Sequence, residues 1–350
     1  MADAVYGKLY QFEGLPRFSG PRSSAASTER RYIPRGRAVP LVGIIRNPRS
    51  HRNKGLEPEL DQCSNILTQT PRSREALRES LGEFAQRGVD YLVIDGGDGT
   101  VRDVLTCGAD IFGESWPTLV VLPKGKTNAL AVDLGLPNQW GLAEALVAAR
   151  KGGLVERRPM RISAVADRGC ALGFFLGAGV FTKGTEAGQA AHRRGAFNSF
   201  AVGLTILWTI IQVVFGRKAN PWRASTRMRL RDRTSGRELP HSGRSAPDER
   251  FMAIATTFKN FPLGVRPFGR HVPDGLKLAV LDSPVRWLLL LLPAILLGFF
   301  GRFMERAGAR RFAATSVDLE LSGAFILDGE AFPAGHYVLE EGPQLTFVVP

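Results

Sequence analysis

The feature that most constrains the fold of this chain is a β-type apolar run that ends in a glycine-rich turn, Tyr91-Leu92-Val93-Ile94-Asp95-Gly96-Gly97-Asp98-Gly99-Thr100. Glycines lack side chains, so the backbone N–H groups of such a turn can approach an anionic ligand closely. Thr100 and Asp103 follow with the spacing of a helix N-terminus, which adds partial positive charge. Asp98 would repel a phosphate, so we assign it to Mg²⁺ or to a Mg²⁺-bound water. The stretch predicts a nucleotide phosphate site.

The order strand, polar loop, helix recurs through residues 39–158. Apolar strands are expected at 41–45, 91–95 and 118–122, with helices at 73–86, after the glycine turn and from about 129. This alternation predicts a parallel, helix-covered sheet with ligands at the carboxyl ends of the strands. Asn47, Asp98 and Asn128 stand at three such ends and are expected to meet in one cleft. The apolar helix after Gly99 disfavours the alternative of a simple hairpin turn.

Beyond about residue 159 the pattern changes to short β-like segments. They lie at 161–166, 170–176, 226–231, 251–257, 277–281, 316–321, 324–327 and 344–349. Turns such as Asp274-Gly275 and Asp328-Gly329 separate some of them. The pattern predicts a second, mainly antiparallel β domain over 159–350, with an exposed basic loop at 232–250.

Charge points to an anionic partner. The net charge is +13, from 46 basic and 33 acidic residues, which suits either nucleic acid or an acidic membrane surface. Nucleic acid is disfavoured because aromatic residues do not alternate with the basic ones and no binding motif is present. Residues 1–38 predict a mobile basic arm. The three cysteines are far apart and no signal-peptide pattern opens the chain, so we expect a cytoplasmic protein.

Two strongly apolar segments interrupt the β-rich region, at 200–215 and 287–300, and arginines follow each of them. Both are shorter than the roughly 20 residues that a membrane-spanning helix needs. We expect helical insertions at about 197–216 and 285–305 that lie at a membrane interface. A pair of core helices with solvated basic ends remains the alternative. A lipid substrate would agree with either arrangement.

Four motifs in order resemble those of the soluble diacylglycerol kinase and sphingosine kinase family, including its bacterial members. They are Asn47-Pro48-x-Ser50 with Gly55, Gly96-Gly97-Asp98-Gly99-Thr100, Pro123-x-Gly125-x-x-Asn128 and Asp328-Gly329-Glu330. The resemblance covers roughly residues 40–350. It implies a Rossmann-like α/β nucleotide-binding domain and a C-terminal β-sandwich domain, with catalysis in the cleft between them. The glycine motif alone is shared with NAD kinases and phosphofructokinases.

The resemblance also implies roles for individual residues, with ATP and Mg²⁺ as cofactors. The nucleotide site would include Asn47, Thr70, Gly96, Gly97, Gly99, Thr100, Lys126 and Asn128. Asp98 would act beside the Mg²⁺–phosphate group, and Glu330 would be the general base. A structural Mg²⁺ would be held by His271, Asp274 and Leu276, although Pro273 stands where relatives often have a second Asp. Lys126 replaces a usual Thr or Ser. We expect it to contact a phosphate of ATP, so that Lys126→Thr raises the KM for ATP.

The expected function is that of an ATP- and Mg²⁺-dependent lipid kinase, peripherally associated with an anionic membrane surface. Three other functions stay open: an NAD kinase-like small-molecule kinase, a catalytically silent membrane-associated nucleotide-binding regulator, and a nucleic-acid-binding protein. The sequence decides neither the lipid that is phosphorylated nor the oligomeric state, and a homodimer is one of the open states.

Overall fold

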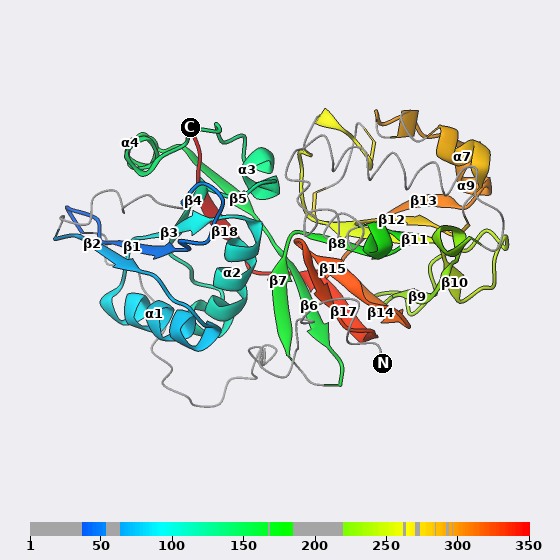
Figure 1. Cartoon of the computed structure of the whole chain (residues 1–350), viewed down its shortest axis with the longest axis horizontal. Helices are drawn as coiled ribbons and strands as arrows, with labels where there is room; N and C mark the ends of the chain where they lie inside the picture. Colours follow the sequence, from blue (N-terminus) through cyan, green and yellow to red (C-terminus); the bar gives the residue numbers. More distant parts are fainter. Residues whose placement is uncertain are drawn as a thin grey trace.

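The chain forms two lobes that lie side by side in Figure 1. The computed structural model describes residues 37–53, 64–166, 169–184, 220–261, 264–269, 274–283, 285–291, 294–295 and 297–350. The expected apolar insertion at about 197–216 and nearly all of the expected basic arm at 1–38 lie outside these ranges. The first lobe contains most residues up to about 158, and the second contains two antiparallel sheets.

The first lobe is built on a six-stranded mixed sheet in the order β2-β1-β3-β4-β18-β5. The strands are β1 (Val42–Arg46), β2 (Ile66–Gln69), β3 (Tyr91–Gly96), β4 (Thr118–Pro123), β5 (Leu154–Arg157) and β18 (Leu345–Val348). The first four strands are parallel, as their alternation with helices predicts, and β18 joins β4 in parallel. β5 pairs antiparallel with β18. The sheet is therefore mixed, where the sequence pattern predicted a parallel one.

Four helices belong to this lobe: α1 (Arg74–Arg87), α2 (Asp98–Phe112), α3 (Ala129–Asp133) and α4 (Leu142–Arg150). The helix predicted at 73–86 is confirmed as α1. It begins after Ser73, whose Oγ accepts the N–H of Ala76 at 3.2 Å, and it ends at Gly88, whose φ is 65°. A left-handed residue at this position suits glycine because an added Cβ would be strained there. The buried face of α1 includes Leu81 and Phe84.

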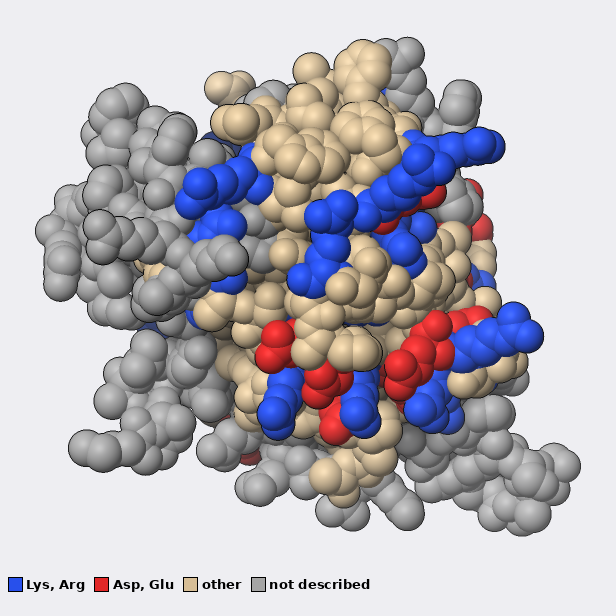
Figure 2. All heavy atoms as spheres, turned by 90° about the vertical axis from the view of Figure 1, so that its right-hand side faces the viewer, with Lys and Arg blue, Asp and Glu red and all other residues tan. Residues whose placement is uncertain are grey.

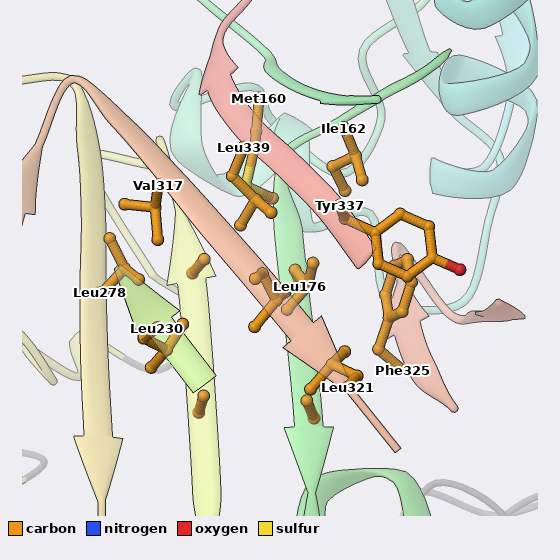
Figure 3. Close-up of a cluster of buried hydrophobic side chains, with 14 of the residues drawn as sticks. Met160, Ile162, Leu176, Leu230, Leu278, Val317, Leu321, Phe325, Tyr337 and Leu339 are labelled. Atoms are coloured by element: carbon orange, nitrogen blue, oxygen red, sulfur yellow. The ribbon is translucent and has the colours of Figure 1, made fainter. Parts of the chain in front are cut away.

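The second lobe consists of two six-stranded antiparallel sheets. One has the order β10-β9-β14-β17-β6-β7, and the other has the order β13-β12-β11-β8-β15-β16. Their strands are β6 (Met160–Ala164), β7 (Cys170–Gly173), β8 (Phe175–Gly179), β9 (Thr226–Asp232), β10 (Glu249–Arg250), β11 (Met252–Thr256), β12 (Leu276–Leu281), β13 (Ala309–Ala314), β14 (Ser316–Leu321), β15 (Phe325–Leu327), β16 (Glu330–Phe332) and β17 (Gly335–Glu341). Buried side chains of both sheets form one hydrophobic cluster, part of which is shown in Figure 3. Burial of these apolar faces against each other is what holds the two sheets together.

Three predictions for this region need correction. The strand at 344–349 was expected in the second domain, but as β18 it lies inside the first sheet, where Leu345 and Phe347 are fully buried. The segment 170–176 is divided at Phe174 into β7 and β8, which belong to different sheets. The predicted exposed loop at 232–250 ends on a buried residue, Arg250, which forms an ion pair with the buried Asp282.

The lobes meet where α2 lies against β7. Thr106 in the middle of α2 is fully buried. Its Oγ1 accepts the N–H of Leu172 at 3.0 Å and donates to the carbonyl of the same residue at 3.3 Å. Phe174 stacks on Phe258 next to this contact, with ring centroids 5.5 Å apart. The helix that begins at the glycine turn is therefore attached to both lobes.

The second apolar segment includes two short helices, α7 (Arg286–Leu290) and α9 (Arg302–Arg306), which lie at the outer end of the second lobe (Figure 1). Within the ranges that the structure describes, no helix is both long enough and apolar enough to cross a membrane.

Candidate active site between the lobes

The loop after β1 is attached to the first turn of α2 through Asn47. The backbone N–H of Asn47 donates to the carbonyl of Asp95 at 3.0 Å, and its side-chain Nδ2 donates to Oγ1 of Thr100 at 2.9 Å. Its Oδ1 accepts the N–H of Arg49 at 3.0 Å. Two of the predicted nucleotide-site residues, Asn47 and Thr100, are therefore in direct contact.

A buried carboxylate that the sequence analysis did not assign holds the same loop. Asp95 is only 6% exposed. Its Oδ1 accepts Nδ2 of Asn53 at 2.9 Å, and its Oδ2 lies 3.8 Å from Nε of Arg46. A buried carboxylate needs such partners because isolated burial of a charge is costly. Asp95 thus stabilises the position of the loop rather than facing the ligand.

The two glycine turns, after β3 and after β4, are packed backbone to backbone. A Cβ added to Gly97 would lie 2.8 Å from Cα of Gly125, and a Cβ on Gly125 would lie 2.7 Å from Cα of Gly97. The N–H of Lys124 also donates to the carbonyl of Gly96 at 3.0 Å. Gly99 differs, because a Cβ there would be 3.8 Å from its nearest neighbour. Gly97 and Gly125 are needed for packing, whereas the space beside Gly99 can accept a ligand.

Asn128 closes the second turn. It has a positive φ of 50°. Its Oδ1 accepts the N–H of Gly125 at 2.8 Å, and its Nδ2 donates to the carbonyl of Gly125 at 3.0 Å. Both hydrogen bonds stabilise the loop itself, and the Asn128 side chain is buried. Lys126 lies between these residues and is exposed.

Asp98 is the first residue of α2 and connects it to α3. Its Oδ1 accepts the N–H of Leu130 at 3.3 Å. Burial raises the pKa of Asp98, and hydrogen bonds from the backbone of Ala129 and Leu130 act in the opposite direction. Asp98 is therefore a partly buried carboxylate next to both glycine turns.

The Asp-Gly-Glu motif is a hairpin turn in the second lobe. Asp328 and Gly329 have φ values of 44° and 86° and join β15 to β16, so that Leu327 lies opposite Glu330. This is the turn that Asp-Gly most favours between two strands. The Asp328 carboxylate accepts the N–H groups of Phe174 and Phe175 at 3.0 and 2.9 Å. Burial raises the pKa of Asp328 to about 7, and the nearby Asp98 adds to this rise. Glu330 itself is exposed.

Arg102 brings this hairpin to the glycine-turn helix. Its side chain is 2% exposed. Its Nη1 donates to the carbonyl of Leu327 at 3.3 Å, and its Nη2 donates to Oδ1 of Asp103 at 3.0 Å. Arg102 is not among the site residues predicted from the sequence. The sequence did contain a signal for it. An arginine beside the apolar helix positions Val101 and Val104 has a long side chain that can pass along the buried face, which indicates a partner near the core.

A cleft of about 560 Å³ lies beside α1 and the first turn of α2. Its lining residues are Ile45, Arg46, Asn47, Pro48, Arg49, Pro71, Arg72, Ser73, Arg74, Leu77, Thr100 and Asp103. The volume falls within the usual range for small-molecule sites, and the arginines give it a positive lining. Thr70 has an exposed side chain and is not among the lining residues, although the next residue, Pro71, is.

The expected structural Mg²⁺ site stays a prediction, and its Asp274 carboxylate has a cationic partner in the structure. Nζ of Lys259 lies 2.9 Å from Oδ1 of Asp274 and lowers the pKa of that carboxyl. The buried Lys277 is a second ammonium close to Asp274. The N–H of Leu276 donates to Oε1 of Glu341 at 3.3 Å, and His271 lies outside the described residues. Among the described residues, no three of His, Cys, Asp or Glu are grouped so that they could hold a metal.

Comparisons with known proteins agree with this architecture. Residues 43–161 match the family model of the diacylglycerol kinase catalytic domain. The chain is 29% identical over 122 residues to the probable lipid kinase YegS of Escherichia fergusonii, which is 34% of this chain and 40% of that protein. It is 43% identical over 49 residues to the alpha subunit of ATP-dependent 6-phosphofructokinase of Saccharomyces cerevisiae, which is 14% of this chain and 4% of that protein.

A crystal structure of a diacylglycerol kinase from Bacillus anthracis shares the fold. Its TM-score is 0.57 at 17% identity, and the match covers 89% of this chain and 97% of that one. The chain thus has an α/β lobe followed by antiparallel sheets in the arrangement of a diacylglycerol kinase. The sequence likeness to the diacylglycerol kinase catalytic domain covers residues 43–161, and the match to YegS spans 40% of that protein.

Proposed function

We propose that this protein is a Mg²⁺-dependent lipid kinase that transfers the γ-phosphate of ATP to a hydroxyl group of a lipid such as diacylglycerol or a sphingoid base. The observation that carries the proposal is the link through Arg102. This buried side chain joins the hairpin that bears Glu330 to the helix that begins at Asp98. A proton acceptor and a phosphate-binding turn are the two parts that phosphoryl transfer to an alcohol needs.

In this proposal ATP occupies the arginine-lined cleft, with its phosphates directed toward Gly99 and Thr100. Asp98 would hold Mg²⁺, whose preferred ligands are carboxylate and phosphate oxygens. One carboxylate combined with substrate phosphates is a usual Mg²⁺ ligand set, so the residues fit the ion. Bound Mg²⁺ would neutralise charge on the phosphates. Lys126 would add a further cation from the exposed loop.

Glu330 would accept the proton of the lipid hydroxyl as the hydroxyl oxygen bonds to the γ-phosphorus. The bond from that phosphorus to the bridging oxygen of ADP breaks, and ADP leaves with the electron pair. The exposure of Glu330 supports this role, because a large substrate must reach the base. The lipid class follows from the family model and from similarity to a lipid kinase, both of which cover about a third of the chain.

The decisive experiment follows label from γ-labelled ATP into a total lipid extract in the presence of Mg²⁺. The variant is Glu330→Gln. Its matched control is Glu320→Gln, which changes an exposed glutamate on β14 in the other sheet. Loss of the proton acceptor is expected to lower kcat by about 100-fold or more, with unchanged thermal stability. The control is expected to keep wild-type turnover.

Each outcome has a definite meaning. A labelled lipid that disappears with Glu330→Gln supports the kinase, and its chromatographic position names the substrate class. If the Glu330→Gln variant kept wild-type turnover, Glu330 would not be the general base. In a parallel reaction with NAD in place of the lipid extract, labelling of NAD but of no lipid would identify a small-molecule kinase instead. ATP binding without transfer to either acceptor would favour a silent regulator.

A further inference from the structure

Exposed apolar side chains gather on the two short helices α7 and α9, and on the residues between them, at the outer end of the second lobe. Trp287, Leu290, Leu297, Phe299 and Phe303 are 41 to 65% exposed. They make up five of the ten large exposed hydrophobic residues in the part of the chain that the structure describes. We call these five residues, with the arginines around them, the α7–α9 surface. Single exposed apolar residues need no explanation, but a gathered patch marks an interaction site.

The inner sides of the same helices hold this surface in place. Leu288 and Met304 are 1% and 3% exposed and pack in one cluster with Phe251, which precedes β11, and with Leu281 of β12. On the outer side, the rings of Trp287 and Phe303 stack with centroids 5.5 Å apart. The segment is therefore apolar on two sides: one side packs on the protein, and the other is exposed.

Cations surround the exposed apolar residues. Arg286, Arg302 and Arg306 are exposed on α7 and α9. Arg223 lies near Arg286, and burial together with this like charge lowers the pKa of Arg223. Figure 2 shows this face: in its upper half, neutral residues are bordered by Lys and Arg, and most of the Asp and Glu side chains gather in the lower half. The acidic residue within α9 is Glu305.

We propose that the α7–α9 surface docks onto the surface of an anionic lipid bilayer. Leucine, phenylalanine and tryptophan side chains enter the interface between headgroups and acyl chains, and arginines at their rim meet the anionic headgroups. A second copy of the chain is a poorer occupant. A symmetric contact through this surface would place the same arginines opposite one another.

The α7–α9 surface lies away from the residues proposed for phosphoryl transfer. In Figure 1, α7 and α9 lie at the far end of the second lobe, whereas α2 and β15 lie near the junction of the lobes. The surface would therefore recruit the enzyme to its lipid and would not act on the phosphoryl group. This docking role rests on the proposed lipid kinase function. Vesicle binding can nevertheless be measured without nucleotide, independently of catalysis.

The test is sedimentation of the full-length protein with sucrose-loaded vesicles of phosphatidylglycerol and phosphatidylcholine, or of phosphatidylcholine alone, without ATP. The variant is the pair Leu290→Asp and Leu297→Asp, at positions 65% and 60% exposed. The matched control is Val147→Asp, which is 53% exposed on α4 of the first lobe. A charge placed in the inserted face is expected to weaken binding to the anionic vesicles about tenfold or more. The control should bind as the wild type does, and the melting temperatures should agree.

Three results would overturn the inference: equal vesicle binding by the paired variant and the wild type, equal binding to both vesicle compositions, or a change in oligomeric state with vesicle binding intact. The last result would assign the surface to a protein partner. Turnover with a short-chain, water-soluble diacylglycerol distinguishes the two proposals. The paired variant should keep that turnover. If no lipid is phosphorylated but vesicle binding still depends on Leu290 and Leu297, the docking surface stands and the kinase proposal fails.

Discussion

At the scale of single residues, Arg102 shows how one side chain can combine parts of a site that lie far apart in the sequence. It donates to the carbonyl of Leu327, which lies 225 positions further along the chain. Its planar guanidinium donates in several fixed directions, which an ammonium group cannot reproduce. Because Arg102 acts on the hairpin of Glu330 and is itself buried, we regard it as a positioning residue.

Replacing Arg102 by Met should lower kcat by about 10- to 100-fold with little change in the KM for ATP, because the base is misplaced while the nucleotide cleft is kept. Arg102→Lys should recover part of the loss. Steady-state kinetics at varied ATP, with melting temperatures for both variants, check this. A rise in KM with unchanged kcat would show that Arg102 serves nucleotide binding instead.

Asp328 makes stability depend on pH. Its pKa in the folded protein is raised to about 7, against about 4 for an unfolded Asp. The folded state therefore keeps a proton that the unfolded state has lost. This contribution to stability is complete below about pH 4 and is lost as the pH rises through about 7.

Between pH 5 and 7, the free energy of unfolding should therefore fall more steeply for the wild type than for Asp328→Asn. The two slopes should differ by up to about 1.4 kcal/mol per pH unit. Urea unfolding at several pH values measures the two slopes. The comparison uses the slopes alone, since Asn also changes the hydrogen bonds to Phe174 and Phe175. Parallel slopes would contradict the raised pKa.

At the scale of elements, the glycine turn contains glycines with different tasks. A Cβ on Gly97 meets the backbone of Gly125, which cannot move without shifting the whole second turn, whereas a Cβ on Gly99 meets no close neighbour.

Gly97→Ala should therefore destabilise the protein by about 1–3 kcal/mol, as overpacking does. Gly99→Ala should keep its stability but raise the KM for ATP, because the methyl group enters the space assigned to phosphate. Chemical unfolding and ATP titration separate the two effects, and equal behaviour of the variants would refute the division of tasks.

At the scale of the whole molecule, the chain returns to its first lobe at its end. β18 lies between β4 and β5, so the sheet beside the arginine-lined cleft depends on residues 345–348. Phe347 is fully buried, and its ring lies 6.5 Å from that of Phe174, between β7 and β8. The two lobes are therefore not independent along the sequence.

Phe347→Ala should lower the free energy of unfolding by about 3–5 kcal/mol, because it leaves a cavity in the core. Thr346→Ala, the adjacent and only partly buried position, should cost less than about 1 kcal/mol. Denaturant unfolding of the full chain measures both values. If Phe347→Ala were as mild as Thr346→Ala, β18 would not be part of the core of the first lobe.

Local features of this protein follow from residues that lie close together in the sequence. The helix after the glycine turn, the helix predicted at 73–86 and the Asp328-Gly329 turn are confirmed, but the helix after the glycine turn begins at Asp98, with Gly97 as its N-cap, and not at Thr100. Strand alternation also predicted that Asn47 and the glycine turn would meet, because parallel strands end at one edge of a sheet.

Which distant residues become partners depends on how the whole chain packs. Nothing near β18 in the sequence indicates that it joins the first sheet, since a strand shows its own periodicity but not its neighbours. The same holds for Arg102 with Leu327, for Lys259 with Asp274 and for the division of 170–176 between two sheets. These pairings are set by burial of the assembled core and by the need of each buried polar group for a partner. Both are properties of the folded chain as a whole.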